Sequence, residues 1–438
     1  MHSRVSRLVS VIGGLSISVS SAVAFGQVPP PPRPGAMVAP IETPEPAPAP
    51  TLVETPAPVV AAPDPAPAVT PFASPVAAPK AGVGPLKIDD GNGNSIRFGF
   101  LLQPQYQAAN SSNPALDKYT QNLYLKRTRI LVGGTLFGDL EYFLDTDYPN
   151  LFLASNTAAA DATPNFAKNT PGMNVQDAFV TYRAIGDMLK VDAGYMLPAM
   201  GHNALQGAAT LFGWDYYAYS FQHGNRFGSA GNPIGRDAGV QLRGLVLDGH
   251  LEYRAGLFQG KRDNQSATEV AARNFFRATA RVQVNLLDAE PGYFYAGTYL
   301  GKKQILSLGA SFDIQDNYKY FAVDGFADLP VGPGVVTAQI NLARWDGGTF
   351  IPTFNKQTAL MGEAGYTLAD LNLSPIVRVE KLWTLAGTND ELRLAGGLAY
   401  WHHGHNSNLK AFFTHVKNDL ATTQAYNQIN LQWQVYYY

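Results

Sequence analysis

Residues 276–286, which read FRATARVQVNL, alternate apolar and polar side chains along their whole length. Successive side chains of a β-strand point to opposite faces. Val282 and Leu286 would therefore share one face, while Arg277 and Arg281 share the other. The first face suits lipid and the second suits water, which is typical of a strand in a transmembrane barrel. A strand of a soluble sandwich alternates in the same way, so the rest of the chain has to decide between the two.

Segments of the same kind recur from residue 95 to the end of the sequence. Together they predict an all-β fold: a transmembrane antiparallel β-barrel of 16 strands, preceded by a disordered Pro/Ala-rich segment. An even number of strands with both termini on one side is what a bacterial outer-membrane barrel requires. The predicted strands are 95–107, 123–134, 139–146, 175–183, 189–196, 236–246, 249–258, 275–286, 305–313, 318–328, 335–345, 357–366, 374–384, 391–401, 409–417 and 426–437.

The connections between these strands differ in length on the two sides of the predicted barrel. Almost all long ones, among them 147–174 and 197–235, would lie on one side, and tight turns on the other. Long external loops opposite short periplasmic turns are typical of outer-membrane barrels. Residues 287–304 are the exception, because they form a long connection on the side of the tight turns. Within them, 293–300 could instead be a further strand.

The N-terminal region predicts export. Arg4 and Arg7 precede an apolar run that ends at Ala24, the pattern of a secretory signal peptide spanning 1–24. The run is short for a spanning helix, although an uncleaved anchor is the alternative. Residues 25–86 are rich in Pro and Ala, which favours neither helix nor sheet and predicts a disordered periplasmic spacer. This spacer is either a plain tether or a segment that contacts peptidoglycan. The predicted barrel domain is 87–438.

The composition narrows the function further. The chain has no cysteine, so an exported fold cannot depend on disulfides. Its net charge of −2 argues against a nucleic-acid binder, which usually carries a basic face. With 22 Tyr and 23 Phe but no long apolar runs after the signal peptide, the chain fits a barrel with aromatic girdles.

Nine arginines fall in the polar phase of their strands and are predicted to line the pore and bind anions. Facing lipid would cost an arginine about 2–4 kcal/mol at the midplane of a barrel. A guanidinium keeps its charge and offers a fork of donors that matches phosphate or carboxylate. The alternative is pairing with carboxylates that share the same phase, which would cancel much of the field. The nine are Arg127, Arg129, Arg183, Arg243, Arg254, Arg277, Arg281, Arg378 and Arg393.

Several segments resemble the phosphate-selective porin O and P family in their order and spacing, over roughly 95–438. They are 125–130 (LKRTRI), 134–136 (GTL), 175–182 (VQDAFVTY), 235–240 (GRDAGV) and 256–260 (GLFQG). The resemblance implies a sixteen-stranded outer-membrane barrel, usually trimeric, with inward arginines that pass phosphate-like anions.

Two other features invite a functional reading. Within the 197–235 connection, residues 212–221 include six aromatic residues, which would be buried if the loop folded into the pore, or would pack on the outer rim or at a subunit interface. The stretch 401–405, WHHGH, contains possible metal ligands, but no Asp or Glu lies nearby and a plain turn is favoured. No G-x-S-x-G elbow occurs. We therefore expect no metal, no cofactor and no enzymatic activity. The six aromatic residues are Phe212, Trp214, Tyr216, Tyr217, Tyr219 and Phe221.

The sequence thus predicts a porin in the outer membrane of a Gram-negative bacterium, exported through the secretory pathway. It would let small hydrophilic solutes diffuse passively, with a possible preference for anions such as phosphate. The expected partners are outer-membrane lipid, the solutes, two further copies in a homotrimer and, through the spacer, peptidoglycan. The alternative is a structural or adhesive barrel with a plugged lumen. A barrel enzyme is disfavoured because His202 and His223 have no convincing partner.

Overall fold

The computed structural model describes residues 86–113, 119–154, 172–221, 235–261, 275–351, 354, 356–385, 389–420 and 423–438. The predicted signal peptide and all but the last residue of the predicted spacer lie outside these residues. The cleavage site and the spacer's role therefore stay predictions.

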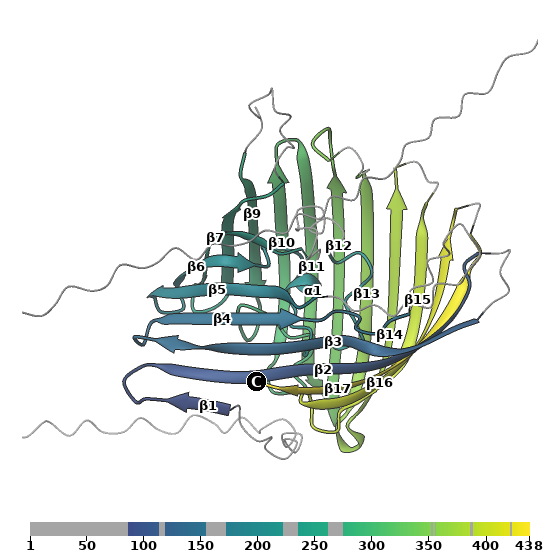
Figure 1. Ribbon diagram of the computed structural model, residues 1–438, viewed down its shortest axis with the longest axis horizontal. Coiled ribbons are helices and arrows are strands. Elements are labelled where there is room, and N and C mark those ends of the chain that lie inside the picture. The colour runs from purple at the N-terminus through teal and green to yellow at the C-terminus, as the bar shows by residue number, and fades with distance from the viewer. Residues whose placement is uncertain are drawn as a thin grey trace, which may run out of the picture. The chain divides into compact units, whose positions relative to one another are not determined.

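Sixteen antiparallel strands form a closed barrel, as predicted (Figure 1). Each strand pairs with the next along the chain, and the last pairs with the first, with Leu431 opposite Tyr106. All sixteen predicted strands are present, with ends that differ by a few residues. The strands are β2 (Ser95–Asn110), β3 (Tyr119–Leu136), β4 (Leu140–Asp147), β5 (Asn174–Ile185), β6 (Leu189–Met196), β7 (Asp237–Val246), β8 (Leu251–Phe258), β9 (Arg277–Asn285), β10 (Ile305–Gln315), β11 (Tyr318–Val331), β12 (Gly334–Asp346), β13 (Gln357–Leu368), β14 (Leu373–Thr384), β15 (Glu391–Tyr400), β16 (Ser407–Asn418) and β17 (Tyr426–Tyr437).

One short strand was not predicted. β1 (Leu86–Asp89) pairs antiparallel with the start of β2, with Ile88 opposite Ile96. Asp90 holds the turn between them, because its carboxylate accepts hydrogen bonds from the backbone N–H of Asn92 at 2.8 Å and of Asn94 at 3.1 Å. Four residues are too few for an alternating pattern to be recognised, so the sequence alone did not indicate this strand.

The two faces of the barrel wall separate by chemistry. In β9, Val282 and Val284 are 51% and 44% exposed on the outer face, while Arg277 and Arg281 are at most 2% exposed on the inner face. The other strands repeat this arrangement of apolar residues outside and polar residues inside. An apolar outer band is what contact with lipid requires. No helix in the described part of the chain is long and apolar enough to span a membrane.

The connections follow the strand order, so odd and even ones lie on opposite rims. On the rim that holds both ends of the barrel, tight turns join β7 to β8 and β11 to β12. In the first of these, Leu247 and Asp248 have φ values of 54° and 55°, the left-handed conformation of a two-residue hairpin turn. This rim is called the turn rim below, and the other the loop rim. Two long connections break the pattern and determine the interior of the barrel.

Candidate functional site: the interior of the barrel

Every one of the nine predicted pore-lining arginines forms an ion pair with a carboxylate. Arg183, near the turn rim, is the most exposed, with 36% of its side chain accessible. A pore-lining or anion-binding role for these residues stays a prediction. The pairs are Arg127 with Asp215, Arg129 with Asp145 and Asp147, Arg183 with Glu141, Arg243 with Asp192, Arg254 with Glu252, Arg277 with Asp313 and Asp237, Arg281 with Asp324, Arg378 with Glu363 and Glu380, and Arg393 with Glu391.

The strand register explains these pairs. Glu363 on β13 stands directly opposite Arg378 on β14, so the two side chains meet across the ladder. Arg277 bridges at 2.6 Å to Asp313, and both side chains are fully buried. Within the described residues, ten lysines and arginines and twelve aspartates and glutamates are buried, so the interior has no excess of positive charge. Paired charges produce a weaker field along the lumen than free ones.

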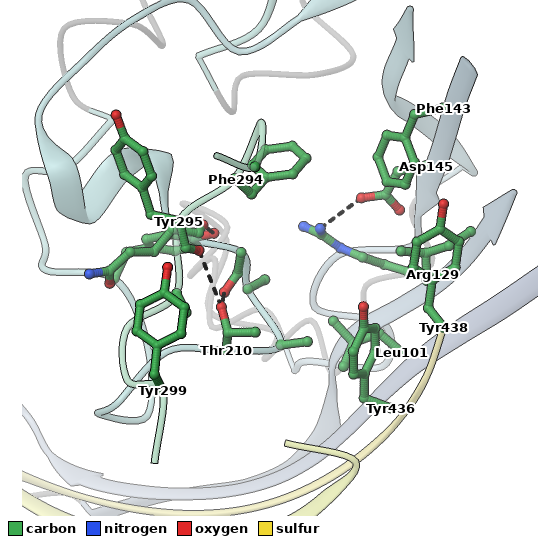
Figure 2. Close-up of a pocket in the computed structure, with 18 of the residues that line it drawn as sticks. Leu101, Arg129, Phe143, Asp145, Thr210, Phe294, Tyr295, Tyr299, Tyr436 and Tyr438 are labelled. Atoms are coloured by element: carbon green, nitrogen blue, oxygen red, sulfur yellow. Dashed lines mark hydrogen bonds and ion pairs between the residues drawn. The ribbon is translucent and has the colours of Figure 1, made fainter. Parts of the chain in front are cut away.

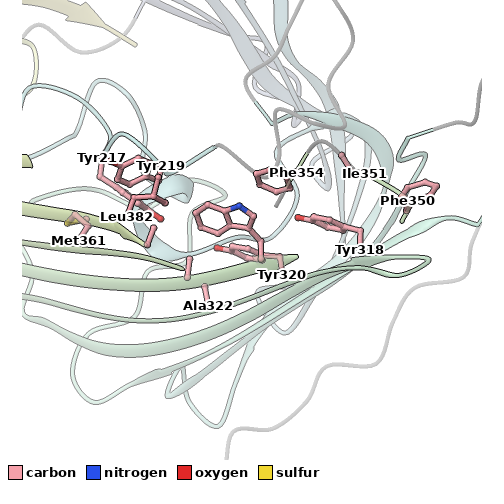
Figure 3. Packing of buried hydrophobic residues seen from close by; sticks show 13 residues of the cluster. Tyr217, Tyr219, Tyr318, Tyr320, Ala322, Phe350, Ile351, Phe354, Met361 and Leu382 are labelled. Atoms are coloured by element: carbon pink, nitrogen blue, oxygen red, sulfur yellow. The ribbon is translucent and has the colours of Figure 1, made fainter. Parts of the chain in front are cut away.

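The described part of the loop that follows β6, residues 197–221, folds into the barrel, which is one of the two alternatives that the sequence left open. It carries the short helix α1 (His202–Leu205), whose residues are all buried. Tyr217 and Tyr219 pack with Tyr320 and Met361 of the wall in one apolar cluster (Figure 3). Buried aromatic groups of this size hold the loop against the strands. We call residues 197–221 the inward loop.

Trp214 and Asp215 tie the inward loop to two further parts of the wall. The Trp214 ring lies 4.6 Å from the Arg378 guanidinium. Asp215 bonds Arg127 at 2.6 Å and Lys126 at 2.8 Å. Burial by itself would raise the pKa of Asp215, but these two cations outweigh it and hold that pKa well below its usual range. Asp215 therefore keeps its charge and its bonds in mild acid.

A second segment enters the barrel from the opposite rim, and the sequence did not predict this. Residues 286–304, here called the inward segment, meet the inward loop by backbone hydrogen bonds. Tyr295 donates to the Leu205 carbonyl at 3.0 Å and accepts from Gly207 at 2.9 Å. Gly297 donates to the Thr210 carbonyl at 3.0 Å. The segment forms one isolated bridge rather than the alternative strand at 293–300. The inward loop and the inward segment together form a plug.

His202 connects the two halves of the plug. Its ring is stacked between Tyr295 and Phe326, with centroids 4.6 and 4.5 Å away. The Gln206 amide donates to Nδ1 at 3.1 Å, so Nε2 carries the proton and donates to Glu290 at 2.9 Å. Burial alone would raise the pKa of Glu290, but His202 and the other hydrogen-bond donors outweigh it and lower that pKa. The carboxylate is thus kept charged inside the plug.

Space lies beside the plug along β2, β3, β4 and β17. A central cavity of about 380 Å³ lies between the plug and this wall (Figure 2). A turn-side cavity of about 690 Å³ shares Phe143, Phe294 and Tyr438 with it. A loop-side cavity of about 170 Å³ shares only Tyr216 with the central one. The three cavities are therefore arranged in a row past the plug.

Tyr216 separates the central cavity from the loop-side cavity. Its hydroxyl donates to the Gln206 carbonyl at 2.6 Å, and its ring lies 5.4 Å from the Arg127 guanidinium. Phe221 packs edge-on against the same ring, with centroids 4.8 Å apart. Three neighbours thus hold the Tyr216 side chain in place between the two cavities.

The predicted turn at 401–405 holds no cluster of three possible metal ligands, and none occurs elsewhere among the described residues. Instead, His405 serves as a contact to the inward segment, because its Nε2 donates to the Thr298 carbonyl at 2.9 Å. Its Nδ1 is buried, and no residue in the described part of the chain forms a hydrogen bond with it. Burial lowers the pKa of His405 to about 4. The folded protein therefore favours the neutral ring.

The lowered pKa of His405 predicts a loss of stability in mild acid. Between pH 6.5 and 4 the unfolded chain takes up a proton at this site and the folded chain does not, so the free energy of unfolding falls as the pH falls. We expect a loss of about 1–2 kcal/mol between pH 7 and 5, measured by urea unfolding in micelles. His405→Gln should remove this contribution, whereas His403→Gln, at an exposed position of the same turn, should keep it. Equal pH profiles for the two variants would contradict the assignment.

Comparisons with known proteins support the fold. No family model matches the sequence, and no curated protein does either. Among solved structures, OprB of Pseudomonas putida is similar at a TM-score of 0.52 and 9% identity, covering 78% of this chain and 94% of that one. The outer-membrane channel DcaP of Acinetobacter baumannii aligns at a TM-score of 0.48 and 13% identity, over 80% of this chain and 99% of that one. At such identity the likeness to OprB shows a shared barrel fold alone. The resemblance to the phosphate-selective porins stays a prediction.

Proposed function

We propose that this protein is an outer-membrane porin of a Gram-negative bacterium, through which small hydrophilic solutes diffuse passively beside the plug. One observation carries the proposal: a closed sixteen-stranded barrel has an apolar outer face and, along one wall, three cavities in a row. Barrels of this strand number are wide enough to hold an aqueous passage. The solute would enter at the loop rim, pass Tyr216 and leave through the turn-side cavity. No chemical step is required, so the protein is not proposed to be an enzyme.

The plug restricts what can pass. The loop-side cavity measures about 170 Å³, room for one small solute with little water around it. We therefore propose a low conductance and a strong dependence on solute size. We also propose a preference for anions such as phosphate, and we expect it to be small because each predicted arginine already has a carboxylate partner. Charge selectivity should accordingly be weak.

The assembly and its partners are also proposals. The outer faces of β11, β12 and β13 carry the small residues Gly325, Ala327, Ala338, Gly362 and Ala364. Small side chains would let the wall of a second copy approach closely, which supports the predicted homotrimer. The remaining outer surface would contact lipid. Contact of the spacer with peptidoglycan and export through the secretory pathway remain predictions from the sequence.

The plug favours a second candidate, a structural or adhesive barrel that does not conduct. The two halves of the plug are joined by backbone hydrogen bonds and by the buried His202–Glu290 contact. A plug held in this way could close the lumen permanently, leaving the loops at the rim as the functional surface. Conductance separates the two candidates.

The first test is single-channel conductance of the refolded protein without residues 1–24, in a planar bilayer under a salt gradient. We expect a small, steady conductance with a reversal potential near that of an unselective pore. Tyr216→Ala removes the ring that separates the central cavity from the loop-side cavity and should raise the conductance about twofold or more. Tyr400→Ala, which removes a tyrosine exposed on the outer face, is the matched control and should change nothing. If neither the correctly folded parent protein nor the Tyr216→Ala variant conducts, the porin proposal is overturned in favour of the plugged barrel.

A further inference from the structure

The central cavity combines two surfaces that rarely occur together in a simple water-filled passage. One is aromatic and apolar: it is formed by Phe143 of the wall and by Phe294 and Tyr295 of the inward segment (Figure 2). Leu131 of β3 also lines the cavity. Rings placed around a space of this kind accommodate another ring by stacked or edge-on contacts. Water alone would be poorly held against such a lining, which suggests an organic occupant.

The other surface is the guanidinium of Arg129, which reaches into the cavity from β3 (Figure 2). Its Nε donates to Asp147 at 3.1 Å and its Nη1 to Asp145 at 2.9 Å. No described residue accepts a hydrogen bond from Nη2. Tyr436 of β17 and Tyr438, which follows the strand, also line the cavity, and their hydroxyls have no hydrogen-bond partner in the described part of the chain. The free polar groups that these three residues present are thus hydrogen-bond donors.

The neighbouring carboxylates do not offset this arrangement of donors. Asp145 and Asp147 each give an oxygen to Arg129, and Asp177 accepts from Arg236 at 3.1 Å. The second oxygen of Asp145 is buried away from solvent and has no hydrogen-bond partner among the described residues. Arg236 and Lys303 also line the cavity. Together with Arg129 they make three basic groups, as many as the three aspartates. A solute entering the cavity therefore meets donors at its polar end and rings around its body.

We propose that the central cavity binds small organic acids with a ring-shaped apolar body, whose carboxylate accepts from Arg129 Nη2 and a β17 tyrosine hydroxyl. A carboxylate matches the guanidinium fork and the phenol donors. The ring of the acid packs beside Phe143 and Phe294, whose own rings meet edge-on with centroids 6.1 Å apart. A cavity of about 380 Å³ holds one such solute. The inference deepens the proposed porin function, since the solute has to reach the cavity along the proposed route.

The test is equilibrium binding of benzoate to the folded protein in lipid nanodiscs, where both rims are open to solution, measured by isothermal titration calorimetry. Benzyl alcohol has the same ring without the charge, and inorganic phosphate has the charge without the ring. We expect both to bind at least about tenfold more weakly than benzoate, because each lacks one of the two contacts. Phosphate binding as tightly as benzoate, or benzyl alcohol doing so, would overturn the proposed solute class.

Variants locate the site. Arg129→Gln should weaken benzoate binding about tenfold or more, while Arg344→Gln, at an outward position of β12, should leave it unchanged. Since Arg129→Gln also disturbs an ion pair, Leu131→Trp provides an independent variant that fills the cavity and keeps Arg129; it should abolish binding. Benzoate binding that survives Leu131→Trp would overturn the site. Binding in nanodiscs does not depend on conductance, so this result and the porin test can fail separately.

Discussion

Replacing residues 289–303 with the dipeptide Asn-Gly is expected to raise single-channel conductance about fivefold or more. The inward segment fills the part of the lumen that a sixteen-stranded barrel would otherwise leave to water. Its removal also deprives the inward loop of the three backbone hydrogen bonds that join it to Tyr295 and Gly297. Asp288 donates to the Gln304 carbonyl at 2.9 Å, so the two ends of the deletion already face each other as in a hairpin. Asn-Gly suits a two-residue hairpin turn.

The turn between β7 and β8 provides the matched control. Leu247 and Asp248 both have positive φ, so Leu247→Asn with Asp248→Gly places the same dipeptide on the same rim in a conformation that it prefers. That variant should fold at least as well as the parent and conduct equally. If the deletion leaves the conductance unchanged while the barrel still folds, the inward segment is not the obstruction and the inward loop alone closes the lumen.

The wall of the barrel was predictable from the sequence because its determinants are local. Alternation along each strand depends only on neighbouring residues. Because the outer face of every strand contacts lipid and the inner face contacts polar groups, apolar residues point outward in all strands. This is why residues 276–286 indicated both a strand and the inward direction of Arg277 and Arg281. The ends of strands were less well defined, since pairing with a neighbour extends β3 beyond the alternating stretch.

The interior was predictable only in part, because its contacts join residues far apart in the chain. The aromatic residues of 197–221 indicated either a loop folded into the pore or a contact at the rim, and three of the six, Phe212, Tyr217 and Tyr219, are buried inside the barrel. The inward segment gave a weaker signal: an unusually long connection on the turn rim that also contains Tyr293, Phe294, Tyr295 and Tyr299. Its length and its rings together could have indicated burial. Its partner, the inward loop, could not have been identified without the register of the closed barrel.

The partner of each arginine was also beyond the sequence. The inward-facing positions of the strands include both arginines and carboxylates. Which arginine pairs with which carboxylate depends on the stagger between strands. Arg281 on β9 reaches past β10 to Asp324 on β11, a pair 43 positions apart. No local pattern encodes such a contact. Phase therefore predicted where charges lie, and the closed structure was needed to see that they are paired.

Asp324→Asn is expected to lower the free energy of unfolding by about 3–5 kcal/mol, because it leaves the buried Arg281 without its counter-charge. Arg281 bonds the two oxygens of Asp324 at 2.6 and 2.8 Å, and neither side chain is more than 2% exposed. The same guanidinium donates to the Met200 carbonyl of the inward loop and to the Tyr295 hydroxyl of the inward segment, both at 3.2 Å. One wall residue therefore anchors both halves of the plug. Urea unfolding of the refolded protein in micelles measures the loss.

Two further variants separate the charge effect from general damage. Asp346→Asn breaks a surface pair with Lys356, in which the side chains are 35% and 49% exposed, and should cost less than about 1 kcal/mol. Replacing both partners, Arg281→Met with Asp324→Leu, should recover most of the stability, because a buried ion pair gives little net gain over well-packed apolar groups. That double variant would still lack the anchor, so its plug should loosen and its conductance should rise although its barrel is stable. Recovered stability with an unchanged conductance would show that Arg281 holds the wall and not the plug.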